Sequence, residues 1–363
     1  MSALRILFIS GKLSPQVCGI AAYTEILARN LADQGVQVGH LGLSKKPLHR
    51  SIIGTKLILM LIQEVAHRRP TLIHLQYEAF SFGQSFLLPL FLALLPIPLV
   101  VTQHEVFHRN WLEKFRDSLL AKKARLILVN DQGRKADFIR LFPSTEEKIV
   151  CVGVGSNVPK LSRPVPIQKN LIGFFGFLNA VKRLDVLFSA FEEVVHAIPS
   201  AKLRIVGAID FQSEEFLKLQ AWLKAKNLEA KVEWTGRVSD QKASELISEC
   251  ELMVLPFLDG ASPRRGSLQA CFLLEKAVLT SQPVRTEADF IGLALVEGFN
   301  SKDWSNRIKQ ILSRADLRLE LESISRALAE KYSWGQIAGR HLSLYSERFP
   351  HCAAISEEKI QVR

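Results

Sequence analysis

The stretch ELMVLPFLDGASPRRGSLQACFLLEKAVLTS, residues 251–281, decides the fold class. It opens on the apolar run 252–255, which is typical of a short buried strand. A loop of small residues with two arginines follows, then an apolar helix beginning near Gly266, then the strand-like run AVLTS. A strand, a helix and a strand in succession predict parallel strands joined by a crossover helix.

The same alternation continues on both sides of this stretch. Upstream, NLIGFFG, AKLRIVG and KVEWTG are strand-like runs that are each followed by a helical pattern. An earlier series alternates LRILFIS, VQVGHLGL, TLIHL and PLVVTQ with helical periodicity over 20–35 and 55–68. Residues 148–166, rich in Gly, Ser and Pro, are the best linker candidate. We predict an α/β protein with two Rossmann-like doubly wound domains facing a cleft, with ligands beyond the carboxyl ends of the strands.

The composition fits two globular domains in a reducing compartment. The chain has 363 residues, 48% of them hydrophobic, which is enough for two cores. Its five cysteines are far apart and form no CxxC pair, so neither a disulfide framework nor a zinc site is indicated. The N-terminal MSALRILFIS lacks the basic region and long apolar stretch of a secretory signal. We expect a cytoplasmic location.

The most apolar segment is SFLLPLFLALLPIPLVV, residues 85–101, which is about as long as a membrane span. Three prolines interrupt it, and a helix that ends before Pro96 would be too short to cross a bilayer. We therefore expect a buried helix followed by a buried strand.

Positive charge is concentrated in the first half of the chain. Residues 1–160 contain 20 Lys+Arg and 11 Asp+Glu, whereas residues 161–363 contain 27 and 25. The clusters SKKPLHR (44–50), HRR (67–69) and AKKAR (121–125) flank apolar helices and lack interleaved aromatics. They suit an anionic membrane face or a phosphorylated lipid better than a nucleic acid. A solvated basic surface is an equal alternative.

Two loops place glycines and a cation where a phosphate could bind. In GKLSPQVCGIAAY, Gly19 starts a helix whose amides could approach a phosphate, unless it is a plain turn glycine. The loop lacks GxGxxG, which disfavours a nicotinamide enzyme. In FFGFLNAVKRLD, Gly176 stands at a strand end and Lys182 near the next helix. This lysine could neutralise a diphosphate, and an ordinary solvated lysine is the alternative.

The arginine pair of the opening stretch is a further anion site. The arginines precede a helix start, so the unpaired amides of residues 266–268 and a guanidinium could hold a phosphate together. The alternative is surface pairing of the arginines with Asp259 or Glu275. Because both phosphate-binding candidates follow strands of one sheet, we favour the functional interpretation.

Polar side chains at two strand ends complete the candidates. His104 lies just past PLVVTQ, and His74 precedes Gln76, Tyr77 and Glu78 after TLIHL. We place both histidines on strand ends facing the cleft, where a substrate can be bonded or a proton carried, with residues 76–78 on the acceptor side. A structural histidine is the alternative, above all for His74. No Ser-His-Asp, HExxH or P-loop pattern occurs.

These motifs, in this order, resemble the retaining GT-B glycosyltransferases of the family-4 type over nearly the whole chain. The segment CGIAAYTEILARNLADQG is similar to the family's first loop and helix, VVTQHE to its strand-end histidine, and KIVCVGVGSNVP to the turn closing its first domain. YSWGQIAGRHLSLY resembles the segment that leads a C-terminal helix back to the first domain. The resemblance implies an acceptor domain at 1–160, a nucleotide-sugar donor domain at 161–332 and a crossing helix at 333–363.

The donor site follows from the same resemblance. GFLNAVKRLD is similar to the family signature G-R-L-xxx-KG-x-D, which carries the donor-diphosphate lysine onto Lys182, with Phe177 where arginine is usual. DGASPRRGSL looks like a variant donor loop, with Ser262 and Ala270 where two glutamates are usual. VEWTGRVSD resembles the loop that meets the nucleotide base. The donor-side residues implied are Gly19, Gly176, Lys182, Gly236, Arg237, Val238, Ser262, Arg264, Arg265, Gly266, Ser267 and Leu268.

The implied activity is sugar transfer with retention of configuration from a nucleotide-sugar to a glycan or lipid-linked acceptor, in cell-envelope polysaccharide synthesis. Lys182, Arg264 or Arg265 and helix N-termini would stabilise the diphosphate leaving group without a metal or other cofactor. His104 would orient the donor sugar or the acceptor. We expect work at the inner face of the membrane, with no nucleic-acid partner.

Two other classes of function stay open. Phe177, Ser262 and Ala270 would also fit a catalytically silent GT-B protein that binds a sugar nucleotide or partners a transferase. A peripheral membrane adaptor on the same scaffold would bind vesicles and ignore nucleotide sugars.

Overall fold

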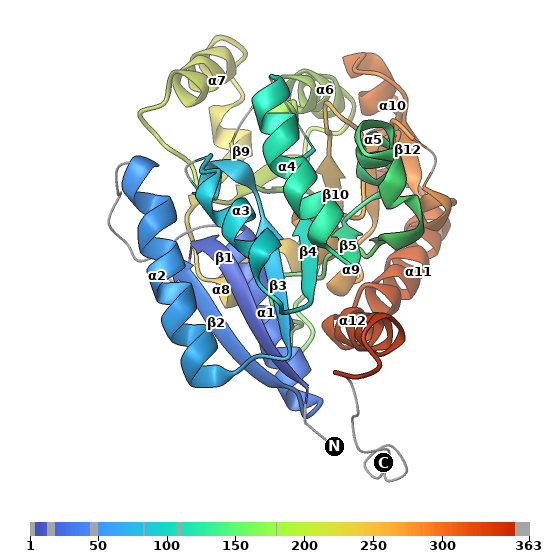
Figure 1. Ribbon diagram of the computed structural model, residues 1–363. Coiled ribbons are helices and arrows are strands. Elements are labelled where there is room, and N and C mark those ends of the chain that lie inside the picture. The colour runs from blue at the N-terminus through green and yellow to red at the C-terminus, as the bar shows by residue number, and fades with distance from the viewer. Residues whose placement is uncertain are drawn as a thin grey trace, which may run out of the picture. The chain divides into compact units, whose positions relative to one another are not determined.

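The computed structural model describes residues 4–12, 19–43, 50–82, 84–106, 110–178, 180–285 and 287–352 (Figure 1). The chain splits into two compact units. Unit 1 comprises Met1–Val154 and Trp334–Arg363, and unit 2 comprises Gly155–Ser333. The last helix of the chain therefore belongs with the first segment, although unit 2 separates them in sequence.

Unit 1 is built on a six-stranded sheet with the order β2-β1-β3-β4-β5-β6, and its neighbouring strands pair in parallel. The order reverses between β1 and β3, which are adjacent. The strands are β1 (Arg5–Lys12), β2 (Gln37–Leu43), β3 (Leu72–Tyr77), β4 (Leu99–Gln103), β5 (Leu126–Val129) and β6 (Ile149–Cys151).

Helices cover both faces of this sheet, because alternate residues of its strands point to opposite sides. Ile6 and Phe8 of β1 pack with α1 (Gly19–Asp33) and α12 (Trp334–Arg348). Leu7 and Ile9 face the opposite layer. That layer contains η1 (Ala79–Phe82), α2 (Arg50–Arg68), α3 (Leu87–Leu94), α4 (Trp111–Lys123), α5 (Gln132–Leu141) and η2 (Pro143–Lys148).

The apolar segment 85–101 forms α3 and then β4. The strand is buried as expected, but the expectation of a buried helix is wrong for half of α3. Leu88 and Leu92 are buried, whereas Leu87, Leu90 and Leu94 are 45%, 47% and 76% exposed. An all-apolar helix gives no polar side to mark its outer face, so the sequence pattern could not show this exposure. Within the described residues, no helix has the length and apolarity needed to span a bilayer.

Unit 2 contains a second six-stranded parallel sheet, with the order β12-β11-β10-β7-β8-β9. The strands are β7 (Gln168–Phe175), β8 (Lys202–Val206), β9 (Val232–Gly236), β10 (Cys250–Leu255), β11 (Val278–Ser281) and β12 (Ala294–Val296). The connecting elements are η3 (Ala180–Lys182), α6 (Leu184–Ala197), α7 (Glu214–Ala225), η4 (Glu229–Lys231), α8 (Asp240–Ser248), α9 (Gly266–Leu273), η5 (Ala288–Phe290), α10 (Ser301–Ser313) and α11 (Ala315–Lys331). Two parallel doubly wound sheets confirm the predicted fold class.

Candidate functional site

The sheet order of unit 2 puts a switch point between β7 and β10. The chain moves from β7 outward to β8 and β9, and from β10 outward to β11 and β12. Open α/β sheets bind ligands beyond the carboxyl ends of the strands at such a point. The loops that leave β7 and β10 there are 176–183 and 256–265, which contain the predicted lysine and arginines.

Lys182 meets the start of α9 at this switch point. It lies at the end of η3, and its Nζ donates to the Ser267 Oγ at 3.2 Å. The same Nζ lies 4.3 Å from the centroid of the Phe257 ring. Gly176 lies next to the lysine, since a Cβ at that position would make an ordinary contact of 3.4 Å with the Lys182 Cε. Residues 85 positions apart in the chain therefore form one contact.

The ammonium group of Lys182 is held in an unfavourable environment. Burial, together with the positive charge of Arg265, lowers the pKa of Lys182 to about 7. Arg264 acts in the same direction. An anion placed among these cations would stabilise the protonated lysine, which makes the group a candidate anion site.

Arg264 and Arg265 share one carboxylate. The Arg264 Nη2 lies 2.6 Å from an Asp259 oxygen, and Arg265 pairs with the other oxygen. The guanidinium carbon of Arg265 lies 4.7 Å from the Phe257 ring centroid, so Phe257 contacts two cations. Pairing with Asp259, the alternative weighed from sequence, is thus present in this structure. Pairing of these arginines with Glu275 is not.

The first turn of α9 offers backbone donors beside these cations. Arg265 occupies the N-cap position, and no side chain caps the helix. A Cβ at Gly266 would meet nothing within 4 Å, so there is open space beside the first residue of the helix. Ser262 accepts from the Arg264 amide at 3.3 Å, while Leu268 is fully buried. Leu268 can therefore contribute only its backbone.

The predicted base-binding segment lies at the same end of the sheet, because β9 runs parallel to β8 and β7, and the loops after β8 and β7 approach each other closely. Gly207 follows β8 with φ of 146°, and a Cβ there would lie 2.1 Å from the Gly176 carbonyl oxygen. Gly236 ends β9 with φ of 64°. Arg237 is exposed, and Val238 packs partly into a small apolar cluster. These three residues lie at the carboxyl end of β9, two strands from Lys182.

His104 follows β4 in unit 1 and is tied to β3. Its Nε2 lies 2.8 Å from the Gln76 Oε1, and its amide donates to the Tyr77 carbonyl. Since an amide oxygen only accepts, the hydrogen of the neutral imidazole is on Nε2 and the basic nitrogen is Nδ1. Burial, reinforced by the charge of Arg134, lowers the pKa of His104 to about 3. His104 is therefore a neutral group that could accept a hydrogen bond.

The other strand-end predictions for unit 1 need correction. His74 lies inside β3 and is fully buried, with its Nδ1 2.6 Å from the Tyr345 hydroxyl of α12. Gln76 and Tyr77 are buried too, and the Tyr77 hydroxyl donates to Asp117 on the opposite face of the sheet. Glu78 accepts from the amides at the start of η1. Strand alternation sends neighbouring side chains to different faces, so residues 76–78 do not form one acceptor surface.

Some predictions fall at the limits of the described chain. Gly19 is the first residue of α1, but the preceding residues 13–18 lie outside the described residues. Most of the basic cluster 44–50 lies outside them as well. Where residues are described, no three His, Cys, Asp or Glu side chains gather in a group that could hold a metal ion. The metal-free reaction stays a prediction.

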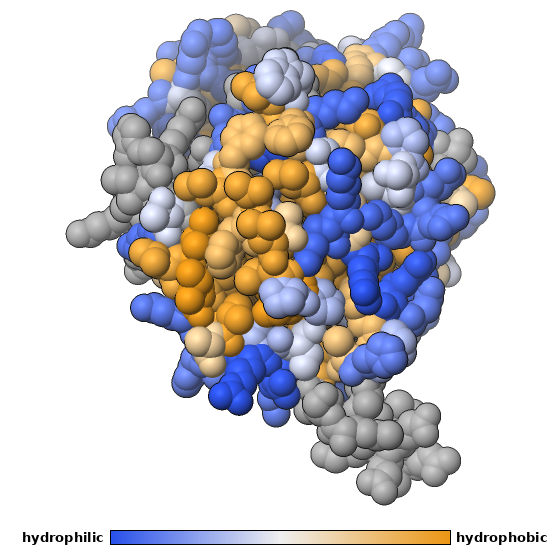
Figure 2. Space-filling view, viewed as in Figure 1, coloured by the Kyte–Doolittle hydropathy of each residue, from blue (hydrophilic) through white to orange (hydrophobic). Residues whose placement is uncertain are grey.

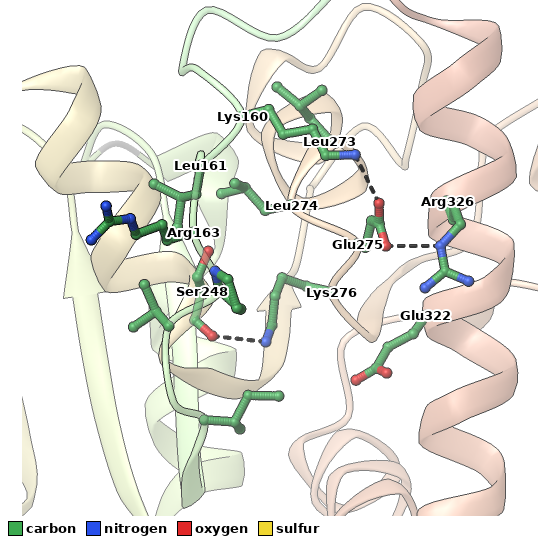
Figure 3. Close-up of a pocket in the computed structure, with 13 residues that line it drawn as sticks. Lys160, Leu161, Arg163, Ser248, Leu273, Leu274, Glu275, Lys276, Glu322 and Arg326 are labelled. Atoms are coloured by element: carbon green, nitrogen blue, oxygen red, sulfur yellow. Dashed lines mark hydrogen bonds and ion pairs between the residues drawn. The ribbon is translucent and has the colours of Figure 1, made fainter.

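A pocket of about 330 Å³ occupies a different part of unit 2 (Figure 3). Glu275 pairs there with Lys160 and Arg326, and the Lys276 Nζ donates to the Ser248 carbonyl (Figure 3). Ser248 and Lys276 stand just before β10 and β11, so this pocket lies at the amino ends of the strands. Because ligands of doubly wound sheets bind at the carboxyl ends, we do not assign the donor to it.

Sequence reasoning missed Phe257 and Tyr345, and it treated Arg183 as a weaker candidate than the neighbouring Lys182. Phe257 looked like a loop residue, yet its ring contacts both Lys182 and Arg265. Arg183 adopts φ of 43°, a left-handed conformation that glycine takes more readily, and pairs with Asp185. The buried contact of Tyr345 with His74 spans 271 residues of chain. The spacing of His341 and Tyr345 on one helix face was the available signal for that contact.

Comparison with known proteins gives matches in sequence and in fold. Residues 159–328 match the family model described as Glycosyl transferases group 1. The D-inositol 3-phosphate glycosyltransferase of Corynebacterium jeikeium is 22% identical over 249 residues, which span 64% of this chain and 59% of that relative. The chain thus matches about three fifths of this relative's length.

Solved structures show the same fold. Sucrose-phosphate synthase from Thermosynechococcus elongatus superposes with a TM-score of 0.75 at 16% identity, over 96% of this chain and all of that one. Anabaena HepE, solved with UDP and glucose, gives 0.70 at 17% identity over 95% of this chain and all of that one. Residues 159–328 thus match the model of the glycosyl transferases group 1, and the whole chain has the same fold as these solved structures.

Proposed function

We propose that the protein transfers a sugar, with retention of configuration, from a nucleotide-sugar to a glycan or lipid-linked acceptor in the assembly of a cell-envelope polysaccharide. One observation carries the donor half of this proposal. Lys182, Arg264 and Arg265 surround the uncapped start of α9 at the switch point of a doubly wound sheet. This arrangement suits a diphosphate better than any neutral ligand.

The chemistry required of these groups is charge stabilisation. As the bond from the sugar to the diphosphate breaks, negative charge develops on the leaving oxygen, and fixed cations and helix amides lower the energy of that state. The diphosphate would also keep Lys182 protonated at neutral pH. The segment 236–238 would contact the base, and neutral His104 would accept a hydrogen bond from the donor sugar or the acceptor. HepE, solved with UDP and glucose, supports a nucleotide-sugar as the donor class.

The acceptor half rests on unit 1. Its sequence carries most of the net positive charge, which suits a phosphorylated or lipid-linked acceptor at the cytoplasmic face of an anionic membrane. The relative named for D-inositol 3-phosphate supports an anionic acceptor in the same way.

Donor binding is tested first by thermal shift with UDP-, GDP- and ADP-linked sugars. A donor at 100 times its Kd should add about 2.7 kcal/mol to the free energy of unfolding. We expect one nucleotide class to stabilise the protein, Lys182→Ala to remove this shift, and Lys160→Ala to retain it as the matched control. If no donor stabilises the wild type, or if both variants respond alike, the proposed site is wrong.

A catalytically silent GT-B protein is the second candidate, because two glutamates implied by the family resemblance are absent. Ala270 is buried within α9 and Ser262 is nearly buried, so neither position supplies a carboxylate beside Lys182. Release of nucleoside diphosphate separates the two candidates. An active transferase releases nucleoside diphosphate slowly without acceptor, by transferring the sugar to water, and faster with acceptor, by transferring the sugar to it. A silent protein binds the donor and releases nucleoside diphosphate only at the background rate.

A further inference from the structure

The exposed apolar side chains of unit 1 are gathered in one region. All ten of its described large apolar side chains that are exposed lie between residues 59 and 115. Monomeric soluble proteins seldom expose a large contiguous apolar patch, and such a patch usually marks an interaction surface. The region therefore needs a partner.

Three neighbouring helices carry eight of these ten side chains. In the layer over the sheet α3 packs against both α2 and α4, so their outer sides form one surface. We call it the apolar face and define it by Leu59, Ile62, Leu90, Leu94, Trp111 and Phe115. Figure 2 shows a broad orange area over these helices. Trp111 is 73% exposed and Leu94 is 76% exposed.

The charged side chains on the outer side of α4 are of one sign. The acidic residues of α4, Glu113 and Asp117, are buried, and Asp117 pairs with buried Arg116 at 2.7 Å. Lys114 and Lys122 point outward, and neither forms an ion pair with a described residue. Lys122 falls on the same helical stripe as Trp111 and Phe115, and α3 has no charged residue. The outer surface of α4 is therefore apolar and cationic.

We propose that the apolar face docks on an anionic lipid bilayer. Leucine, phenylalanine and tryptophan side chains on one side of surface helices, with lysines beside them, are the composition that binds a headgroup boundary. A second copy of the chain fits less well, because a two-fold contact would bring the same unpaired lysines together. The inference rests on the proposed function in one respect, since a lipid-linked acceptor gives the docking its purpose.

Flotation of the full-length protein with lipid vesicles tests the docking. One set of vesicles is pure phosphatidylcholine, and the other contains about 30% phosphatidylglycerol, roughly the anionic fraction at which the surface potential attracts lysines. We expect binding to the anionic vesicles and about 30-fold weaker partitioning after Lys114→Gln with Lys122→Gln, because each lysine near such a surface contributes about a fivefold factor. Trp111→Ser with Phe115→Ser should weaken binding to both vesicle types. The control is Ile291→Ser with Leu319→Ser, which removes exposed apolar side chains from unit 2 and should bind like the wild type.

Lys182→Ala should float with vesicles like the wild type, so failure of docking and failure of the donor site are seen separately. The proposal is overturned if the wild type does not bind anionic vesicles, or if the apolar and lysine variants bind as well as the control. Sedimentation tests the alternative. If it shows a concentration-dependent dimer that the double variant Trp111→Ser with Phe115→Ser abolishes, the apolar face binds a second copy of the chain instead.

Discussion

At the scale of single residues, Lys182 shows a conflict between stability and the proposed binding. A solvated lysine keeps its proton far above neutral pH, but burial beside Arg265 lowers the pKa of this one to about 7. The sequence predicted a cation near the helix start but not its burial, because burial depends on Phe257 and Ser267 from a distant part of the chain. Groups with such shifts cluster at functional sites.

Lys182→Met should stabilise the empty protein near neutral pH. In the wild type, Lys182 releases its proton near pH 7 when the protein is folded and near pH 10.5 when it is unfolded. The free energy of unfolding of the wild type therefore rises with pH between these values. The variant should lack this rise and be more stable at pH 7 by on the order of 2 kcal/mol. Urea unfolding followed by tryptophan fluorescence from pH 6.5 to 9.5 measures both effects. Lower stability of the variant at every pH would contradict the assignment.

Asp259→Asn should tighten the binding of nucleotide diphosphates. The Asp259 carboxylate pairs with Arg264 and Arg265, and its loss removes an anion that competes with the ligand for both guanidinium groups. We expect about a twofold to fivefold lower Kd in calorimetric titrations, because a part-exposed pair contributes up to about 1 kcal/mol. Asp185→Asn, which frees Arg183 instead, is the matched control. Weaker binding after Asp259→Asn would mean that the carboxylate positions the arginines for the ligand.

Gly207→Ala should disrupt the loop contact at the sheet edge. A Cβ would meet the Gly176 carbonyl oxygen at 2.1 Å, and the positive φ of Gly207 is already unfavourable for alanine. We expect a loss of about 2 to 4 kcal/mol in the free energy of unfolding, measured by urea titration. Gly266→Ala has open space around its Cβ and should leave stability within about 1 kcal/mol of the wild type. Equal stability of the two variants would show that the loops can separate freely.

At the scale of elements, α12 is held to unit 1 by buried polar contacts as well as by packing. The Tyr345 hydroxyl lies 2.6 Å from the His74 Nδ1, and the Tyr23 hydroxyl lies 3.4 Å from the His341 Nε2. All four residues are buried. The resemblance suggested that this helix returns to the first domain, but the contacts themselves follow from the three-dimensional fold.

Tyr345→Phe should destabilise the docking of α12. The substitution leaves a buried histidine nitrogen without its partner, which costs about 1 to 3 kcal/mol. Tyr23→Phe removes a longer and weaker bond and should cost less than Tyr345→Phe. Chemical unfolding and hydrogen exchange of the α12 amides measure the difference. Equal losses of stability in the two variants would show that the short bond to His74 contributes no more than the longer bond to His341.

At the scale of the whole molecule, buried histidines make folding sensitive to acid. Burial lowers the pKa of His104 to about 3 and of His341 to about 4, and holds the pKa of His74 well below its usual range. Their unfolded forms titrate near 6.5. Below that pH the unfolded chain binds protons that the folded chain does not, so stability falls as pH falls toward the folded values.

We expect the free energy of unfolding to drop by on the order of 5 kcal/mol between pH 7 and pH 5, since each of the three histidines contributes about 2 kcal/mol. Calorimetry at the two pH values measures this loss. His341→Gln, which keeps a polar side chain but cannot titrate, should reduce the loss by the share of one histidine. An unchanged loss in this variant would assign the acid sensitivity to other groups.

The sequence by itself determined the alternation of strands and helices, the α/β class, and the glycine, lysine and arginine positions at the ends of strands. These features are local, because side-chain periodicity and turn residues act over a few positions of chain. Only the tertiary structure decided that Lys182 meets Ser267, that Asp259 holds both arginines, that His74 is buried under α12, and that one side of α3 is exposed. These contacts depend on strand order and on the packing of distant segments, which no local pattern specifies.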